Sequence, residues 1–171
     1  CYPEAKLYGL NALAPASQAR NLPAVISPEG RLEKGPAYND TIQPGETAGD
    51  WPTYRGNNAR SGRSKAILST SIKPAWTSKL GGRLSALSIA AGRVFVARVD
   101  AHTLHALDQK SGRPLWQYTA GGRIDSPPTI AEGRAIFGSA DGWVYCLRAN
   151  DGKLVWRFRA APRDRRLKAM E

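Results

Sequence analysis

The sequence contains few of the residue types from which many catalytic and metal sites are built. Its 171 residues include two cysteines, two histidines and one methionine. Two cysteines cannot form a disulfide framework or a four-cysteine zinc site. The sequence also has no phosphate-binding loop, nucleophile elbow or zinc signature. These absences argue against an enzyme that carries a complete active site on this chain.

Long hydrophobic runs are missing as well. No apolar run approaches the ~20 residues that a membrane-spanning helix needs. A basic stretch followed by an apolar one, which would mark a signal peptide, does not occur. The chain begins with Cys1 rather than Met, so we expect either that a leader was removed or, as we favour, that the chain was cut from a longer protein. A hydrophobic content of 42% is nevertheless enough for a folded core.

Acidic residues are scarce relative to basic ones. The chain has 25 lysines and arginines against 14 acidic residues, which gives a net charge of +11. This balance favours anionic partners, but scattered surface arginine on a soluble domain also accounts for it, and we favour that interpretation. One stretch is densely basic, namely Arg157, Arg159, Arg163, Arg165 and Arg166. Because no nucleic-acid-binding motif accompanies it, we expect no specific nucleic acid partner and only weak binding to anionic surfaces.

Tryptophan recurs with a period of 40 residues in the second half of the chain. Trp76, Trp116 and Trp156 stand 40 residues apart, and Gly112 and Gly152 each precede a tryptophan by four residues. Further segments align in nearly the same register, 81–84 with 121–124 and 89–93 with 130–134. A fixed period of this length is the signature of a repeat architecture.

Each repeat predicts four short strands. Valine, isoleucine and aromatic residues fill these runs, whereas glycine, aspartate, asparagine and serine separate them. Two of the runs are apolar on both faces, which is typical of a sheet that is covered on both sides. The predicted strands are 85–90, 93–98, 103–108 and 114–119 in the first repeat, and 125–131, 134–139, 143–148 and 154–159 in the second. Four antiparallel strands in ~40 residues describe one blade of a β-propeller.

The turn before each repeat tryptophan resembles a known family. Residues 106–116 read Ala-Leu-Asp-Gln-Lys-Ser-Gly-Arg-Pro-Leu-Trp. They resemble the repeat of the quinoprotein alcohol dehydrogenase-like, or pyrroloquinoline-quinone (PQQ) type, β-propellers. Residues 146–156 resemble a second copy, with Cys146 and Arg148 in place of Ala and Asp, and residues 51–62 resemble the lead-in before a first repeat. More narrowly, the chain is similar to the large PQQ-binding-like propeller repeat proteins of planctomycete-type bacteria.

The resemblance implies a ring of seven or eight blades, in which each repeat tryptophan packs between neighbouring blades. Residues 81–160 supply two of them. We therefore expect Trp76 to lie on an outer strand that completes a blade whose inner strands come from elsewhere in a longer chain. Without such neighbours, sheet faces and strand edges stay open. A soluble, monomeric product of 171 residues is accordingly expected to be only marginally stable.

The predicted fold is all-β: a partial β-propeller of about two four-stranded blades, with a lead-in strand and an irregular N-terminal segment. The expected divisions are an irregular linker or strap over 1–50, a lead-in with the ring-closing outer strand over 51–80, blades over 81–120 and 121–160, and a basic tail over 161–171.

A candidate binding site lies where the innermost strand of each blade begins. Arg83 and Arg123 follow a pair of glycines in each repeat, and Asp125 lies close by. One hypothesis places these three at the mouth of the central channel, where guanidinium groups hold an anionic ligand or a partner loop. The alternative, which we favour, is that the glycines make the turn between blades and the arginines lie on the surface. Asp100 and Asp141 are interpreted as turn residues that bond to nearby backbone N–H groups.

The remaining reactive side chains predict no chemistry. His102 and His105 are three residues apart, so they point to opposite faces of a strand and do not form a metal pair. We expect both to be turn and surface residues. Cys146 lies in an apolar run and is interpreted as a small buried hydrophobe. We therefore predict no catalytic, cofactor-binding or metal-binding residue in this chain.

The function predicted from the sequence is a non-catalytic PQQ-like repeat segment, acting as a structural or protein-binding scaffold within a larger protein. Its partners are then the remaining blades or other proteins. The alternative is a fragment of a PQQ-dependent quinoprotein oxidoreductase whose active-site residues, with PQQ and Ca²⁺, lie on other blades. A third, electrostatic option is an anion binder. The resemblance implies an extracytoplasmic location, periplasmic or secreted.

Overall fold

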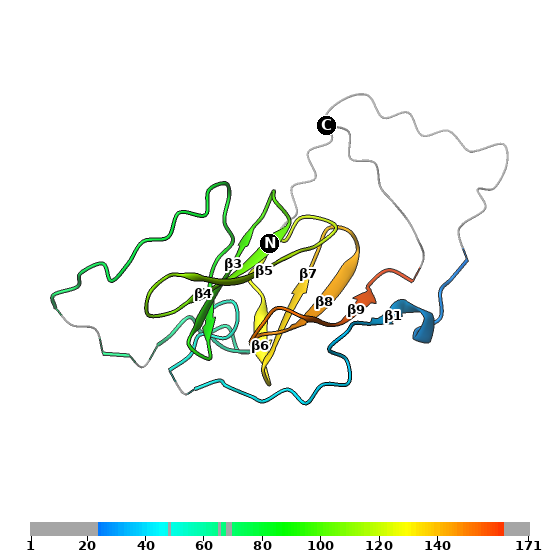
Figure 1. The fold of residues 1–171 in the computed structure, drawn as a ribbon, viewed down its shortest axis with the longest axis horizontal. Coiled ribbons are helices and arrows are strands. Elements are labelled where there is room, and N and C mark those ends of the chain that lie inside the picture. Colours follow the sequence, from blue (N-terminus) through cyan, green and yellow to red (C-terminus); the bar gives the residue numbers. More distant parts are fainter. Residues whose placement is uncertain (1–23, 48, 65, 68–69, 163–171) are drawn as a thin grey trace, which may run out of the picture.

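Two antiparallel β-sheets form the body of the molecule. The computed structural model describes residues 24–47, 49–64, 66–67 and 70–162. Its sheets lie side by side, β2–β5 in green and β6–β9 in yellow to red (Figure 1). A single turn of 3₁₀ helix occupies Glu29–Arg31, and the described residues contain no helix with the length and hydrophobicity to cross a membrane.

The first sheet is a four-stranded meander in the order β2-β3-β4-β5. Its strands are β2 (Ser88–Ala90), β3 (Arg93–Arg98), β4 (Thr103–Asp108) and β5 (Pro114–Thr119). The second sheet repeats this meander as β6 (Thr129–Ala131), β7 (Arg134–Gly138), β8 (Trp143–Arg148) and β9 (Leu154–Arg159). The prediction of two four-stranded units in an all-β chain is thereby confirmed.

The innermost strand of each sheet is shorter than the sequence predicts. Ser85 takes the place of a ladder residue with its side chain, since the Ala97 N–H donates to Ser85 Oγ at 3.0 Å. In the second sheet, Pro127 and Pro128 precede β6 and cannot donate backbone hydrogen bonds. Both strands therefore begin about three residues late.

The two hairpins that follow the innermost strands have matching backbone geometry. Ala91 and Glu132 have φ of 53° and 50°, and the glycines after them have φ of 70° and 71°. Two successive residues with positive φ define the two-residue turn that suits the twist of a hairpin. The predicted strands leave two residues, 91–92 and 132–133, for each of these connections, and the structure forms a hairpin turn at both.

The core lies between the facing surfaces of the two sheets. Side chains alternate along each strand, so every second residue faces the neighbouring sheet. The buried members contributed by the first sheet are Ala90, Phe95, Ala97, Leu104 and Ala106, and those of the second are Ile130, Ala135, Phe137, Tyr145 and Leu147. Phe137 stacks on Tyr145, and Tyr118 meets the edge of the same ring at 5.8 Å between centroids.

Tryptophans join successive repeats by packing on glycines. The Trp116 indole covers Gly152, and its Nε1–H donates to the Ala149 carbonyl at 3.1 Å. Trp76 covers Gly112 in the same way, and its Nε1–H donates to the Gln109 carbonyl at 2.9 Å. Each indole reaches 36 residues ahead in the sequence. This confirms the packing role that the resemblance implied.

The segment around Trp76 has the packing of an outer strand without its hydrogen bonds. Trp76, Ser78 and Leu80 are partly buried and alternate with exposed neighbours, as strand residues do. Residues 74–80 nevertheless form no strand within the part of the chain that the structure describes. The outer strand stays a prediction, because its partner strands are expected from elsewhere in a longer chain and none of the described segments offers these residues a hydrogen-bonding partner.

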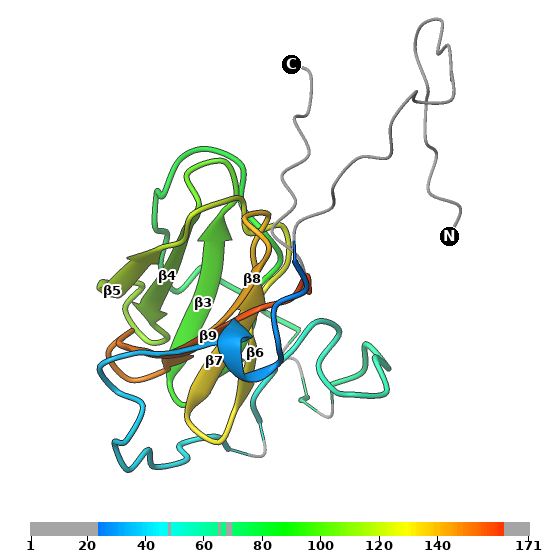
Figure 2. The ribbon, with the colours of Figure 1, turned by 90° about the vertical axis from the view of Figure 1, so that its right-hand side faces the viewer.

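The N-terminal segment is more ordered than the sequence predicts. β1 (Leu32–Lys34) pairs with β9 and makes the second sheet five-stranded, in the order β1-β9-β8-β7-β6. Residues 35–47, which we call the strap, then leave this edge, and Ala37 is fully buried. Figures 1 and 2 both show this blue-to-cyan segment beside β9. The irregular N-terminal segment is thus corrected for residues 29–34, and its first 23 residues lie outside the described chain.

We expect Gly152→Ala to destabilise the protein more than Gly92→Ala. Both glycines have positive φ, 74° and 70°, so alanine brings backbone strain of about 1–2 kcal/mol at either site. A methyl group at Gly152 would also lie 2.6 Å from a Trp116 ring carbon, whereas nothing lies within 4 Å at Gly92. Overpacking adds about 2 kcal/mol. Chemical denaturation of both variants measures the difference, and equal losses would contradict the role of the indole.

Candidate functional site

The three candidate site residues come together at one end of the sheets. Arg83 Nη2 lies 3.6 Å from Asp125 Oδ1, and Arg123 Nη2 lies 3.4 Å from Asp125 Oδ2. Asp100 completes the cluster, because Arg83 Nη2 donates to its Oδ1 at 3.0 Å. All four side chains are more than half exposed. We call these four residues the inner-edge cluster, since three of them precede the innermost strands and Asp100 lies beside them in the turn after β3.

The repeat backbone explains why the two arginines lie close together. The Arg83 carbonyl accepts a hydrogen bond from the Val99 N–H at 2.8 Å, and the Arg123 carbonyl accepts one from Ala140 at 2.8 Å. Each arginine is thereby fixed beside the turn that joins the second and third strands of its own sheet. Because the sheets are neighbours, the two side chains project to the same end of the molecule.

The electrostatics of the inner-edge cluster limit what it can bind. The Asp100 carboxylate raises the pKa of Arg83, and the hydrogen bond from Arg83 lowers the pKa of Asp100. Two guanidinium groups face two carboxylates, so their charges balance. Exposed ion pairs of this kind contribute little stability. An anionic ligand would have to displace these carboxylates from Arg83 and Arg123.

The two turn aspartates differ in their partners. Asp141 acts as predicted, since its carboxylate accepts the Trp143 N–H at 3.1 Å and the Gly121 N–H at 3.0 Å. It also accepts the Tyr145 hydroxyl at 2.6 Å. Asp100, at the corresponding position, pairs with Arg83 instead. Asp141 therefore bonds to backbone N–H groups as predicted, whereas Asp100 forms an ion pair that the prediction did not include.

One histidine is buried, contrary to prediction. His102 lies in a turn with φ of 55°, as expected, but His105 is only 7% exposed on β4. Sequence spacing alone did not show that the first sheet buries the face that carries Val96 and His105. Nε2 of His105 has no hydrogen-bond partner among the described residues. Burial, reinforced by the nearby charge of Arg98, lowers the pKa of His105.

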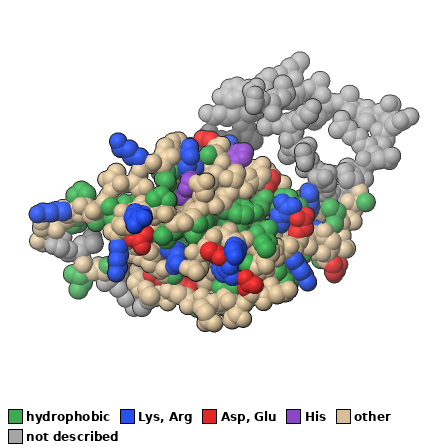
Figure 3. Space-filling view, in the orientation of Figure 1, with side chains coloured by type: hydrophobic (Ala, Val, Ile, Leu, Met, Phe, Trp, Pro, Cys, Tyr) green, Lys and Arg blue, Asp and Glu red, His purple; other side chains and the backbone are tan. Residues whose placement is uncertain are grey.

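On the visible face of the described residues, basic side chains do not gather into one patch. Figure 3 shows lysines and arginines dispersed among acidic and apolar residues on the face it presents. Arg157 pairs with Glu33 at 2.6 Å and lies over the Trp143 ring, and Arg159 contacts the same ring. The remaining arginines of the basic stretch, Arg163, Arg165 and Arg166, lie outside the described residues.

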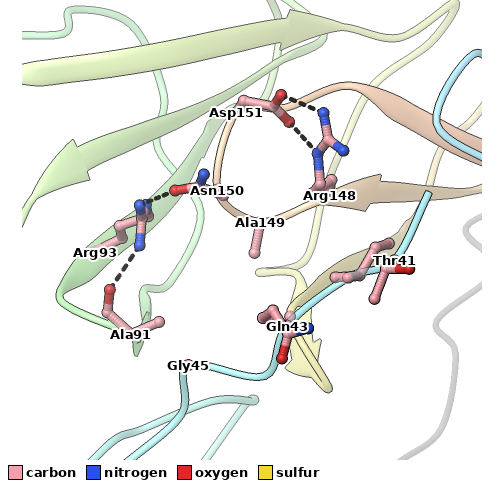
Figure 4. A pocket seen from close by; sticks show the side chains of 11 residues that line it. Thr41, Gln43, Gly45, Ala91, Arg93, Arg148, Ala149, Asn150 and Asp151 are labelled. Carbon is pink, nitrogen blue, oxygen red and sulfur yellow. Dashed lines mark hydrogen bonds and ion pairs between the residues drawn. The ribbon is translucent and has the colours of Figure 1, made fainter.

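A cavity of about 520 Å³ lies between the two sheets beside the strap (Figure 4). The first sheet contributes Ala91 and Arg93, the end of β8 contributes Arg148, and the turn after β8 contributes Asn150 and Asp151. Strap residues Thr41, Ile42, Gln43 and Gly45 line the remaining side. No motif or spacing in the sequence pointed to this site. One difference between the repeats does lie at this cavity: the first repeat has Ala91 in its hairpin where the second has Glu132.

Two sheets of four consecutive antiparallel strands, joined by tryptophans that dock on the following repeat, define a segment of a β-propeller. The family model described as "Outer membrane protein assembly factor BamB", a model of the PQQ repeat, matches residues 60–169. This is more than half of the chain. The chain therefore belongs to this family of PQQ-type β-propeller repeat proteins.

Curated relatives include both an assembly factor and enzymes. The outer membrane protein assembly factor BamB of Burkholderia pseudomallei is 31% identical over 55% of this chain and 25% of its own length. A 1-butanol dehydrogenase (quinone) of Thauera butanivorans is 30% identical over 90% of this chain and 27% of its own length. The chain thus spans about a quarter of the length of these two relatives.

Solved structures support the fold. A quinohemoprotein alcohol dehydrogenase from Pseudomonas putida aligns with a TM-score of 0.58 at 17% identity, covering 66% of this chain and 19% of that one. The corresponding enzyme from Comamonas testosteroni aligns with a TM-score of 0.53 at 20% identity, over 68% and 20%. At these identities, the likeness establishes the propeller fold alone.

Among the described residues, no cluster of side chains suits the calcium ion that accompanies a quinone site. Calcium needs six to eight oxygen ligands, and the described part of the chain gathers no group of three acidic, histidine or cysteine side chains. Cys146 is fully buried, and burial raises the pKa of its thiol to about 11. It is therefore a small core residue, as predicted, and we derive no step through the cofactor.

We expect the stability of the protein to fall below about pH 6.5 because of His105. Its pKa is lowered in the folded state, so the unfolded chain takes up the proton first. The free energy of unfolding is then complete above the ordinary histidine pKa of about 6.5 and declines as the pH falls further.

Melting temperatures measured from about pH 7.5 to about pH 5.5 check this expectation. His105→Leu should flatten the decline, whereas His102→Asn, which suits the left-handed turn, should leave it in place. A decline of the same size in the His105 variant would contradict the assignment.

Proposed function

We propose that this chain is a non-catalytic scaffold segment of a larger PQQ-type β-propeller protein, and that its second sheet docks a further blade. The observation that carries the proposal is the outward face of this sheet, the side opposite the first sheet. Its side chains include Val144, Trp156 and Phe158, which with Leu32 line an apolar hollow of about 210 Å³. We call these four residues the docking face.

The first sheet shows what such a face does when a neighbour is present. Leu104 and Tyr118 occupy the positions that correspond to Val144 and Phe158 in the repeat. Leu104 is fully buried against the second sheet, and Tyr118 packs on Tyr145. Val144 and Phe158 remain only partly buried. Apolar surface of this kind is stabilised by burial against a matching surface.

Trp156 lies at the centre of the proposed interface. Trp76 and Trp116 each cover a glycine of the next repeat, but Trp156 packs with Ala37 and Cys146 instead. No glycine among the described residues receives it. A further repeat would supply that glycine, so we infer that the occupant of the docking face is another blade of the same type.

The relatives support a location and a class of partners for the proposed scaffold. The chain spans about a quarter of their length, which supports a role within a larger protein. One relative is an assembly factor for outer membrane proteins. By this likeness we propose an extracytoplasmic location, with other blades or proteins as the partners.

We expect the isolated chain to self-associate through the docking face. Size-exclusion chromatography and sedimentation should show concentration-dependent association, and Val144→Lys should reduce it, because a charge cannot be buried there without a partner. Leu115→Lys is the matched control, since Leu115 is 48% exposed on β5 of the first sheet. A sharp monomer peak with a cooperative, high-temperature melt, or equal association of both variants, would overturn the proposal.

A second candidate is a segment of a quinoprotein oxidoreductase. The match to 1-butanol dehydrogenase (quinone) over 90% of this chain favours it. Under the scaffold proposal, titration with PQQ and Ca²⁺ should leave tryptophan fluorescence without a saturable change. Saturable quenching that requires Ca²⁺ would favour the oxidoreductase instead. Lysozyme titrated in parallel corrects for light absorbed by the quinone.

A further inference from the structure

We propose that the cavity between the two sheets binds a carboxylate group through Arg93. The cavity lies beside the strap, at the hairpin turns, and none of the docking-face residues lines it. The inference therefore does not depend on the scaffold proposal. A volume of about 520 Å³ lies within the usual range for small-ligand sites.

The second repeat contains an arginine with which Arg93 can be compared directly. Arg134 occupies the corresponding position at the start of β7. Both arginines donate from Nη1 to a hairpin carbonyl, Arg93 to Ala91 at 2.7 Å and Arg134 to Glu132 at 3.1 Å. Arg134 also has a carboxylate, since its Nη1 lies 3.5 Å from Glu132 Oε2. At the position that corresponds to Glu132, the first repeat has Ala91, so the hairpin offers Arg93 no carboxylate.

The positive charge of Arg93 is left without a matching carboxylate. Its Nη2 donates to Asn150 Oδ1, a neutral acceptor, and its buried Nε has no hydrogen-bond partner among the described residues. Within the described chain, no carboxylate oxygen forms an ion pair with its guanidinium group. Two of its five donors are therefore engaged. A carboxylate is the ligand that suits a guanidinium group with several unused donors.

The neighbouring acidic groups are already engaged elsewhere. Arg148 pairs with Asp40 and with Asp151, both at 2.6 Å, so it adds no spare positive charge to the cavity. On the strap side, Glu46 accepts the Gly133 N–H at 2.8 Å, and Asp50 accepts the Ala91 N–H at 3.0 Å. Arg93 is thus the cation on which a ligand would bind.

Ala91 provides the space for that ligand. Its φ of 53° nearly equals the 50° of Glu132, so the two hairpins hold their side chains in equivalent directions. Where Glu132 extends a carboxylate toward its arginine, Ala91 ends in a methyl group at the wall of the cavity. Figure 4 shows Arg93, Asn150 and Gln43 around the same opening. The ligand is accordingly a short molecule or side chain ending in a carboxylate.

Nitrogen–proton spectra of the arginine side chains of the full 171-residue chain test this assignment. Glutarate should shift the Arg93 Nε–H signal saturably and leave that of Arg134 unchanged, whereas the neutral glutaramide should shift neither. Arg93→Gln identifies the signal and should abolish binding. A comparison of glutarate with N-acetylglutamate amide distinguishes a free small acid from the side chain of a partner protein, and binding of either supports the site.

Substitutions at the hairpin separate charge from volume. Ala91→Glu supplies the missing carboxylate from within the chain and should weaken glutarate binding about tenfold or more. Ala91→Gln fills the same space without charge and should weaken binding less. Equal weakening by both variants, equal shifts of Arg93 and Arg134, or no saturable shift with either acid would overturn the proposal.

Discussion

The packing of an indole on a bare glycine is the interaction on which the remaining structure depends. Trp116 lies so close to Gly152 that a side chain there would collide with the ring, and the same is true of Trp76 and Gly112. The Nε1–H bond to a turn carbonyl fixes the orientation of each ring. Together these contacts set the spacing at which one sheet meets the next. The apolar core between the sheets can then close around Phe137 and Tyr145.

The strap adds a second set of links between the two sheets. It begins at the outer edge of the second sheet, where β1 pairs with β9. Its Glu46 then binds the hairpin of the second sheet, and the following Asp50 binds the hairpin of the first. Trp51 finally pairs with Ile89 on the innermost strand. One continuous segment therefore connects the outer edge of one sheet to the inner edge of the other.

The sequence predicted the repeats well because repetition itself carries the information. Six of the eight predicted strands have the observed bounds to within one residue, and the exceptions begin where Ser85 and Pro127 interrupt the ladder. β1 escaped prediction because three exposed residues have no periodicity of their own. The strand forms because β9 offers a free edge, a property of the assembled sheet that the local sequence does not contain.

The candidate site was likewise predictable from the repeats only in part. Repeat alignment brought Arg83, Arg123 and Asp125 to attention, and the structure gathers them into one cluster. Alignment did not show that Asp100 joins them and balances their charge. Burial of His105 and the cavity beside Arg93 also depend on contacts between segments far apart in the chain. Such contacts are set by tertiary packing, which a single sequence does not display.

The distance of 36 residues between each indole and its glycine has a consequence for how such proteins grow. A tandem duplication of one 40-residue unit copies an indole and a glycine together. The tryptophan of the existing unit then packs on the glycine of the added unit. The tryptophan of the added unit can pack on the glycine of a further unit. A gene of this kind can lengthen by whole units without any compensating substitution at the junction. Change is then free to accumulate in the hairpins, where one copy now has alanine and the other glutamate.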